Sequence, residues 1–131
     1  MIGLDTNILV RFIAQDDALQ SPKADAIMAS LTVEEPGWIA LAAIAEFAWV
    51  MKRKFRISRE QIYLTIWNLL SRKELVFEQR EQVSQAMNLY RTGSADFSDY
   101  LVAVSAQAAG CVHSLTFDRK AAKMAGMILA R

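Results

Sequence analysis

Cysteine, histidine, proline and glycine are all scarce in this chain, with one Cys, one His, two Pro and five Gly among 131 residues. The single Cys111 cannot form an internal disulfide, and without a Cys-x-x-Cys motif or a histidine pair there is no pattern for a zinc site. So little Pro and Gly also argues against a disordered tail or a low-complexity linker. The protein must therefore rely on a hydrophobic core, and we expect Cys111 to lie in it.

Long apolar runs and a surplus of charge are missing as well. The apolar stretches are broken too soon for a membrane span, and the first residues carry neither a basic region nor a small-residue cleavage site, so we expect a cytoplasmic protein. Fifteen basic and fourteen acidic residues leave a net charge of +1, which argues against binding nucleic acid through bulk charge. The length fits one domain over residues 1–131.

Short apolar runs alternate along the chain with stretches of helical periodicity. The opening run at 2–4 leads into a helix that Thr6 or Asn7 can cap, and Ser21 and Pro22 look like the N-cap and first residue of the next helix. Further strands are predicted at 38–39, 75–77, 111–115 and 127–129, with helices at 41–54, 58–73, 78–91, 96–109 and 118–123. This order predicts an α/β fold with a mostly parallel central sheet and helices on both faces.

Two aspartates follow predicted strands. Asp5 ends the first apolar run, and Asp118 comes shortly after the strand at 111–115. In open parallel sheets, ligands bind at the edge where the strands end and the helices begin, so both residues are candidate ligands at that edge. Taken singly, each is also what an ordinary helix N-cap looks like.

Two further carboxylates stand alone in apolar surroundings. Glu46 is the only charged residue in the stretch 38–51, and Asp99 is the only one in the stretch 97–117. Acidic residues are almost never fully buried unless they are paired or bind a ligand, and neither stretch contains a Lys or Arg. Asp96 lies one helical turn before Asp99 and can add a carboxylate to the same edge, although it too suits an N-cap.

Carboxylates that converge repel one another unless a cation lies among them. A site built only from carboxylate oxygens suits Mg²⁺ or Mn²⁺ better than zinc, and these ions usually also contact substrate phosphates. The four residues therefore indicate phosphoryl-transfer chemistry at a metal site. The lone His113 is expected in the core or at a strand edge, and it is assigned no catalysis.

Positive charge is concentrated in one segment. Lys52, Arg53 and Lys54 follow one another directly, and Arg56 and Arg59 come soon after. Such a cluster can meet the phosphate backbone of a nucleic acid. It is equally explained as a solvated helix end, because cations are favoured near a helix C-terminus.

Four short motifs, in this order, resemble those of the PIN-domain ribonucleases, and in particular the VapC-type toxins of bacterial toxin-antitoxin pairs. The resemblance covers nearly the whole chain and is carried by Ile2-Gly3-Leu4-Asp5-Thr6-Asn7, by Ala45-Glu46-Phe47-Ala48-Trp49, by the segment 95–103 around Asp99, and by Leu115-Thr116-Phe117-Asp118. One departure concerns the hydroxyl residue that many relatives carry ahead of the helical Glu. Here the segment 40–43 reads Ala-Leu-Ala-Ala and carries no hydroxyl group.

The resemblance implies a three-layer α/β/α PIN-like domain, a Mg²⁺- or Mn²⁺-dependent endonuclease acting on RNA, and a homodimer. It also implies a cognate VapB-like antitoxin that restrains the enzyme. In this scheme the metal-binding and catalytic residues are Asp5, Glu46, Asp99 and Asp118, with Asp96 as a further candidate. Thr6, Asn7 and Thr116 would support them through hydrogen bonds.

Three other functions are alternatives to a toxin. A free-standing PIN-type RNase in RNA processing would use the same residues without an antitoxin. A phosphatase would use Asp5 as its covalent nucleophile. Phosphatases of this kind carry an Asp-x-Asp motif at this point, whereas this chain has Asn7 in place of the second Asp. A non-catalytic module would use the acidic edge only to bind a basic partner, and metal-dependent RNA cleavage separates it from the nucleases.

Overall fold

The computed structural model describes residues 1–130 and divides into two compact units, Met1–Glu78 and Gln79–Arg131. Each unit is described by itself. Across residues 1–130, no helix is both long and apolar enough to cross a membrane.

A three-stranded parallel sheet organises the first unit. It contains β1 (Ile2–Gly3), β2 (Gly37–Ile39) and β3 (Leu75–Phe77) in the order β1-β2-β3. Ile2 pairs with Gly37 in register, and Gly37 pairs with Leu75. The predicted α/β fold with a parallel sheet flanked by helices is thereby confirmed. The parallel arrangement also means that Asp5 and Glu78, which follow β1 and β3, lie beyond the same edge of the sheet.

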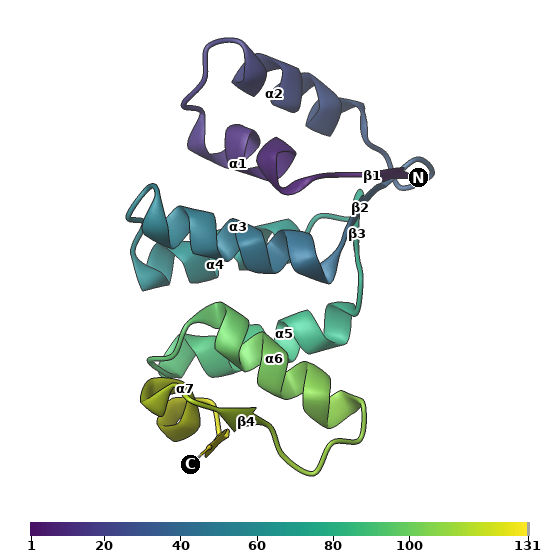
Figure 1. Ribbon diagram of the computed structural model, residues 1–131. Coiled ribbons are helices and arrows are strands. Elements are labelled where there is room, and N and C mark those ends of the chain that lie inside the picture. The colour runs from purple at the N-terminus through teal and green to yellow at the C-terminus, as the bar shows by residue number, and fades with distance from the viewer. Residues whose placement is uncertain (131) are drawn as a thin grey trace. The chain divides into compact units, whose positions relative to one another are not determined.

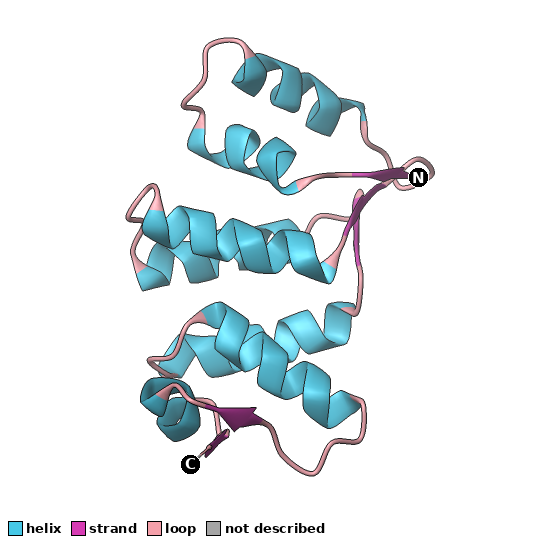
Figure 2. Ribbon diagram, in the orientation of Figure 1, coloured by secondary structure: helices cyan, strands magenta, loops and turns pink. Residues whose placement is uncertain are grey.

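Four helices complete the first unit, in two pairs (Figures 1 and 2): α1 (Thr6–Ala14) with α2 (Gln20–Ser30), and α3 (Leu41–Arg53) with α4 (Arg59–Leu70). The two pairs also meet, because α1 packs against α3. Each helix turns apolar side chains inward at helical spacing. The core of the unit includes fully buried Leu9, Ile39, Ile44, Phe47, Ile66 and Leu69.

The start of α2 differs from the prediction. The helix begins at Gln20 rather than after Ser21, because the carboxylate of Asp17 caps it from outside. Asp17 Oδ1 accepts hydrogen bonds from the amides of Leu19 at 2.9 Å and Gln20 at 2.7 Å. Ser21 is instead buried, and its hydroxyl donates to the Arg11 carbonyl at 2.9 Å, which ties α2 to α1.

Replacing Asp17 with Ala is expected to lower the melting temperature at neutral pH by a few degrees, because α2 loses its cap. The amides of Gln20 and Leu19 hold the pKa of the Asp17 carboxyl below its ordinary value of 3.8. The stability that Asp17 contributes is therefore fully present above pH 3.8 and is lost as the pH falls through the lowered pKa. Thermal unfolding of both proteins across this range should show the difference shrinking in acid. Asp17→Asn keeps the acceptor, so an equally large loss in this variant would contradict the cap.

The second unit contains α5 (Arg80–Thr92), α6 (Phe97–Ala108), β4 (Leu115–Thr116), α7 (Arg119–Met124) and β5 (Ile128–Leu129). Helices α5 and α6 pack against each other, with the Tyr90 and Phe97 rings edge to face at 6.0 Å between centroids. Strands β4 and β5 pair in parallel, and α7 connects them and packs against both. Gly93 ends α5 at a point where a Cβ would overlap the Tyr100 hydroxyl.

The predicted strand at 111–115 is shorter in the structure, and Cys111 is not in the core. Only Leu115 and Thr116 pair with β5, because β5 itself has just two residues to offer. Upstream, the Cys111 amide donates to the Ala106 carbonyl at 3.0 Å and so continues the end of α6 instead of beginning a strand. Cys111 and His113 are consequently exposed. This corrects the expectation that Cys111 lies in the core, and His113, expected in the core or at a strand edge, lies before β4 and outside the core.

Candidate active site

Asp5 follows β1 and caps α1. Its backbone is extended, and its Oδ1 accepts a hydrogen bond from the Thr6 amide at 2.7 Å. The cap of this helix is therefore Asp5 itself, not Thr6 or Asn7, because the carboxylate already reaches the first helical amide. Asp5 is exposed, so Oδ2 is left for another partner. Asn7 is exposed in the first turn and lines a groove of about 270 Å³ between α1 and α2.

Glu46 is linked to the same end of the first unit. The Thr6 hydroxyl donates to the Ala43 carbonyl at 3.5 Å, and Ala43 lies one helical turn before Glu46 on α3. The residue next to Asp5 thus contacts the turn of α3 that leads to Glu46. Thr6 is 6% exposed, and this burial makes its hydroxyl a fixed connection between α1 and α3.

Glu46 stands alone among apolar residues in the sequence, but it is not buried. Glu46 is exposed, because the solvent-facing side of α3 is itself made partly of apolar residues such as Ala42 and Trp49. The buried side of α3 includes Ile44 and Phe47. The helix around Glu46 is therefore an ordinary amphipathic helix, although its sequence is almost entirely apolar.

Glu78 is a residue that the sequence analysis missed. It follows β3, and its Oε1 accepts a hydrogen bond from the Leu41 amide at 2.8 Å, at the beginning of α3. Ala40, the N-cap of α3, has no side chain that could do this. The available signal was the absence of any capping residue in the segment 40–43, which required a cap from elsewhere.

Asp96 and Asp99 lie together at the start of α6 in the second unit. Asp96 is the N-cap, and the Asp99 carboxylate accepts a hydrogen bond from the Asp96 amide at 3.3 Å, as in a capping box. Both residues are half-buried. The capping role considered for Asp96 is thereby confirmed, and the same contact fixes the position of the Asp99 carboxylate.

Asp118 caps α7, and Thr116 supports it. Asp118 Oδ1 accepts from the amides of Lys120 at 2.8 Å and Ala121 at 3.2 Å, while the Asp118 amide donates to Thr116 Oγ1 at 3.0 Å. Asp118 is exposed, and its Oδ2 is left for another partner. These contacts are those of a helix N-cap, and they fix the orientation of the carboxylate.

The predicted carboxylates are divided between the units: Asp5 and Glu46 in the first, and Asp96, Asp99 and Asp118 in the second. Within residues 1–130, no three His, Cys, Asp or Glu side chains form a group that could hold a metal ion. The convergence of these carboxylates at a site for one metal ion or two therefore stays a prediction. The donors themselves are all carboxylate oxygens, the set that Mg²⁺ and Mn²⁺ prefer.

The basic cluster lies at the end of α3 and just beyond it. Lys52, Arg53 and Lys54 are exposed, and Lys54 Nζ lies 5.4 Å from the centroid of the Phe55 ring. Cations at a helix C-terminus interact favourably with the helix dipole, and they can equally bind the phosphates of RNA. The RNA-binding role of the cluster stays a prediction.

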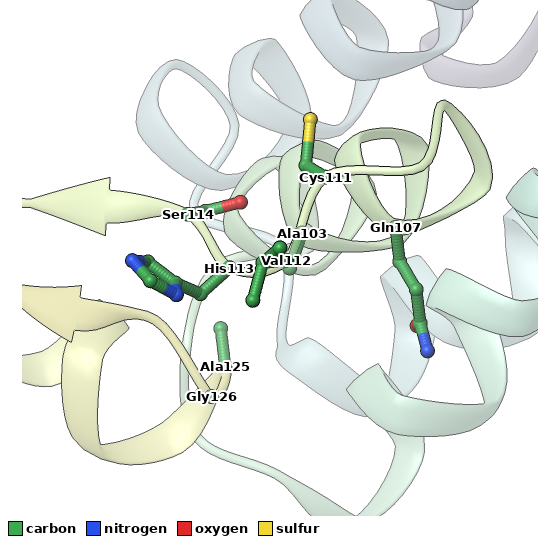
Figure 3. A pocket seen from close by; sticks show the side chains of 8 residues that line it. All are labelled: Ala103, Gln107, Cys111, Val112, His113, Ser114, Ala125 and Gly126. Atoms are coloured by element: carbon green, nitrogen blue, oxygen red, sulfur yellow. The ribbon is translucent and has the colours of Figure 1, made fainter.

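A pocket of about 300 Å³ lies in the second unit (Figure 3). Its lining includes Cys111, His113 and Ser114, three side chains that serve in nucleophilic catalysis elsewhere. Figure 3 shows the Cys111 thiol and the His113 ring pointing in different directions, so the two do not form a nucleophile-base pair. This pocket adds no catalytic residue to the carboxylates.

Comparison with known proteins gives a family match and a similarity to solved structures. The family model described as the PIN domain matches residues 2–127. The crystal structure of Mycobacterium tuberculosis VapC20, described as a toxin that cleaves the sarcin-ricin loop, is similar at 16% sequence identity and a TM-score of 0.46. The similarity covers 100% of this chain and 99% of VapC20. No curated protein matches.

Proposed function

The chain belongs to the PIN domain family, and from this premise we propose that it is a metal-dependent endoribonuclease, the toxin of a VapBC-type pair. The observation that carries the proposal is the span of the family match, 2–127, which includes all four motif carboxylates in order. The structure supports the proposal locally, since the Thr6 hydroxyl links the neighbourhood of Asp5 to the turn before Glu46.

The proposed metal ligands are Asp5, Glu46 and Asp99, with Asp118 and Asp96 completing the site. Mg²⁺ or Mn²⁺, when bound, supplies an activated water and offsets the charge that develops on the scissile phosphate. Asp5 and Asp118 each have Oδ1 held by backbone amides, an arrangement that orients the carboxylate before any ligand arrives. Thr6 and Thr116 act as positioning residues: Thr6 connects α1 to α3, and Thr116 accepts the Asp118 amide.

We further propose two protein partners, a second copy of this chain and a cognate VapB-like antitoxin. Exposed carboxylates such as Asp5 and Glu46 are good acceptors for a bidentate Arg, which would occupy the positions that metal and phosphate otherwise use. An antitoxin with one well-placed Arg could therefore block the site directly.

The test of the function is to incubate the purified protein with a mixed RNA pool in Mg²⁺, in Mn²⁺ and in chelator, and then to map the new RNA ends. We expect cleavage at a restricted set of sites in either metal and none in chelator, because the proposed chemistry depends on the ion. Cleavage that persists in chelator, or metal binding without any cleavage, would refute the nuclease. A phospho-enzyme formed at Asp5 would instead support the phosphatase.

A further inference from the structure

The solvent-facing side of α3 carries a line of three residues: Glu46, Trp49 and Arg53. They lie three and four positions apart, so they share one helical face, and all three are exposed. Seven residues at about 1.5 Å each place Arg53 about 10 Å along the helix from Glu46, with Trp49 between them. A candidate catalytic carboxylate is thus followed along one face by an aromatic ring and then by a cation.

Trp49 is 56% exposed, although tryptophan buries more apolar area than most side chains. Its neighbours at helical spacing on this line are charged, whereas surfaces that bind proteins usually present a contiguous apolar patch. A single exposed ring among charges is typical of surfaces that bind single-stranded nucleic acid. There, bases stack on aromatic side chains while cations contact the backbone.

We infer that Trp49 is a stacking platform for an RNA base beside the cleavage site, with Arg53 contacting the backbone beyond it. The inference rests on the proposed ribonuclease function and adds to it a residue that binds the RNA substrate. Stacking depends little on which base is present, so Trp49 contributes affinity and alignment more than sequence choice. Arg53 thereby gains a defined place within the basic cluster.

Trp67 provides a matched control on α4. It is 44% exposed, similar to Trp49, but its ring is parallel to Tyr63 at 6.5 Å between centroids with an interplanar angle of 4°. It also lies on a helix without any candidate catalytic carboxylate. Both tryptophans occupy helix positions where Ala is well tolerated, so loss of folding is not expected from either change.

The experiment measures binding of a labelled single-stranded RNA of mixed sequence in chelator, where the proposed cleavage does not occur. We expect Trp49→Ala to weaken binding about tenfold or more and Trp49→Phe to restore most of it, since a Phe ring also stacks. Trp67→Ala should remain within about twofold of the wild type. RNA should also quench the tryptophan fluorescence of the wild type and of Trp67→Phe. The quenching should be much weaker in Trp49→Phe, because this variant lacks the stacking tryptophan.

Wild-type affinity in Trp49→Ala, or unchanged quenching in Trp49→Phe, would overturn the stacking role. A change of oligomeric state in Trp49→Ala, measured by light scattering, would also overturn it, because the ring would then pack against a second copy. These results are separate from the proposed function. If the wild-type protein cleaves RNA and Trp49→Ala binds RNA normally, only the stacking role of Trp49 is refuted. If the wild-type protein never cleaves RNA, the proposed nuclease function is refuted.

Discussion

Asp99→Asn is expected to reduce RNA cleavage about a thousandfold or more and to leave the fold intact. A metal ligand supports several kcal/mol of transition-state stabilisation, and each 1.36 kcal/mol is about a factor of ten in rate. The fold should survive because the Asp99 carboxylate accepts from the Asp96 amide at 3.3 Å, and the amide oxygen of Asn can accept the same hydrogen bond. Glu46→Gln should act likewise, since Glu46 is exposed and its loss disturbs no core packing.

The measurement is single-turnover cleavage in Mg²⁺ together with thermal unfolding. Glu60→Gln is the matched control, because Glu60 is also an exposed helical glutamate of the first unit but lies on α4 and in none of the four motifs. It should cleave RNA at the wild-type rate. Undiminished cleavage by Asp99→Asn with an unchanged melting temperature would remove Asp99 from the site.

Co-expression with a neighbouring antitoxin is expected to restore growth to cells that produce this protein. An active ribonuclease harms its host unless something restrains it, and exposed carboxylates such as Asp5 and Glu46 offer a target for an Arg on a partner's tail. We therefore expect a short adjacent reading frame whose product has a DNA-binding N-terminal half and a tail mixing apolar residues with at least one Arg.

Colony counts measure the effect. Cells with the full neighbour should grow like cells that produce Asp99→Asn, whereas cells with a neighbour lacking its tail should not. Replacing the tail Arg with Ala is the sharper variant, because it keeps the apolar contacts and removes only the charged group. Equal rescue by the complete and the tailless protein would refute inhibition at the carboxylates.

Local sequence signals were sufficient for most elements. The strand at Leu75–Phe77 was predicted where the structure has it, as were the capping roles considered for Asp96 and Asp118. Capping depends on residues at most a few positions apart, so it can be recognised from sequence. One of the failures was also a local competition, because Asp17 replaces Ser21 as the cap of α2.

The sequence by itself determined the order of strands and helices and the parallel sheet, because periodicity and capping act over a few neighbours. Only the tertiary structure decided how the beginning of α3 is held. Glu78 caps Leu41, and Thr6 reaches Ala43, each across 37 positions of the chain. Neither side chain carries a local sign of its partner. Both contacts exist because β1, β2 and β3 end at one edge, where the sheet brings distant segments within hydrogen-bond distance.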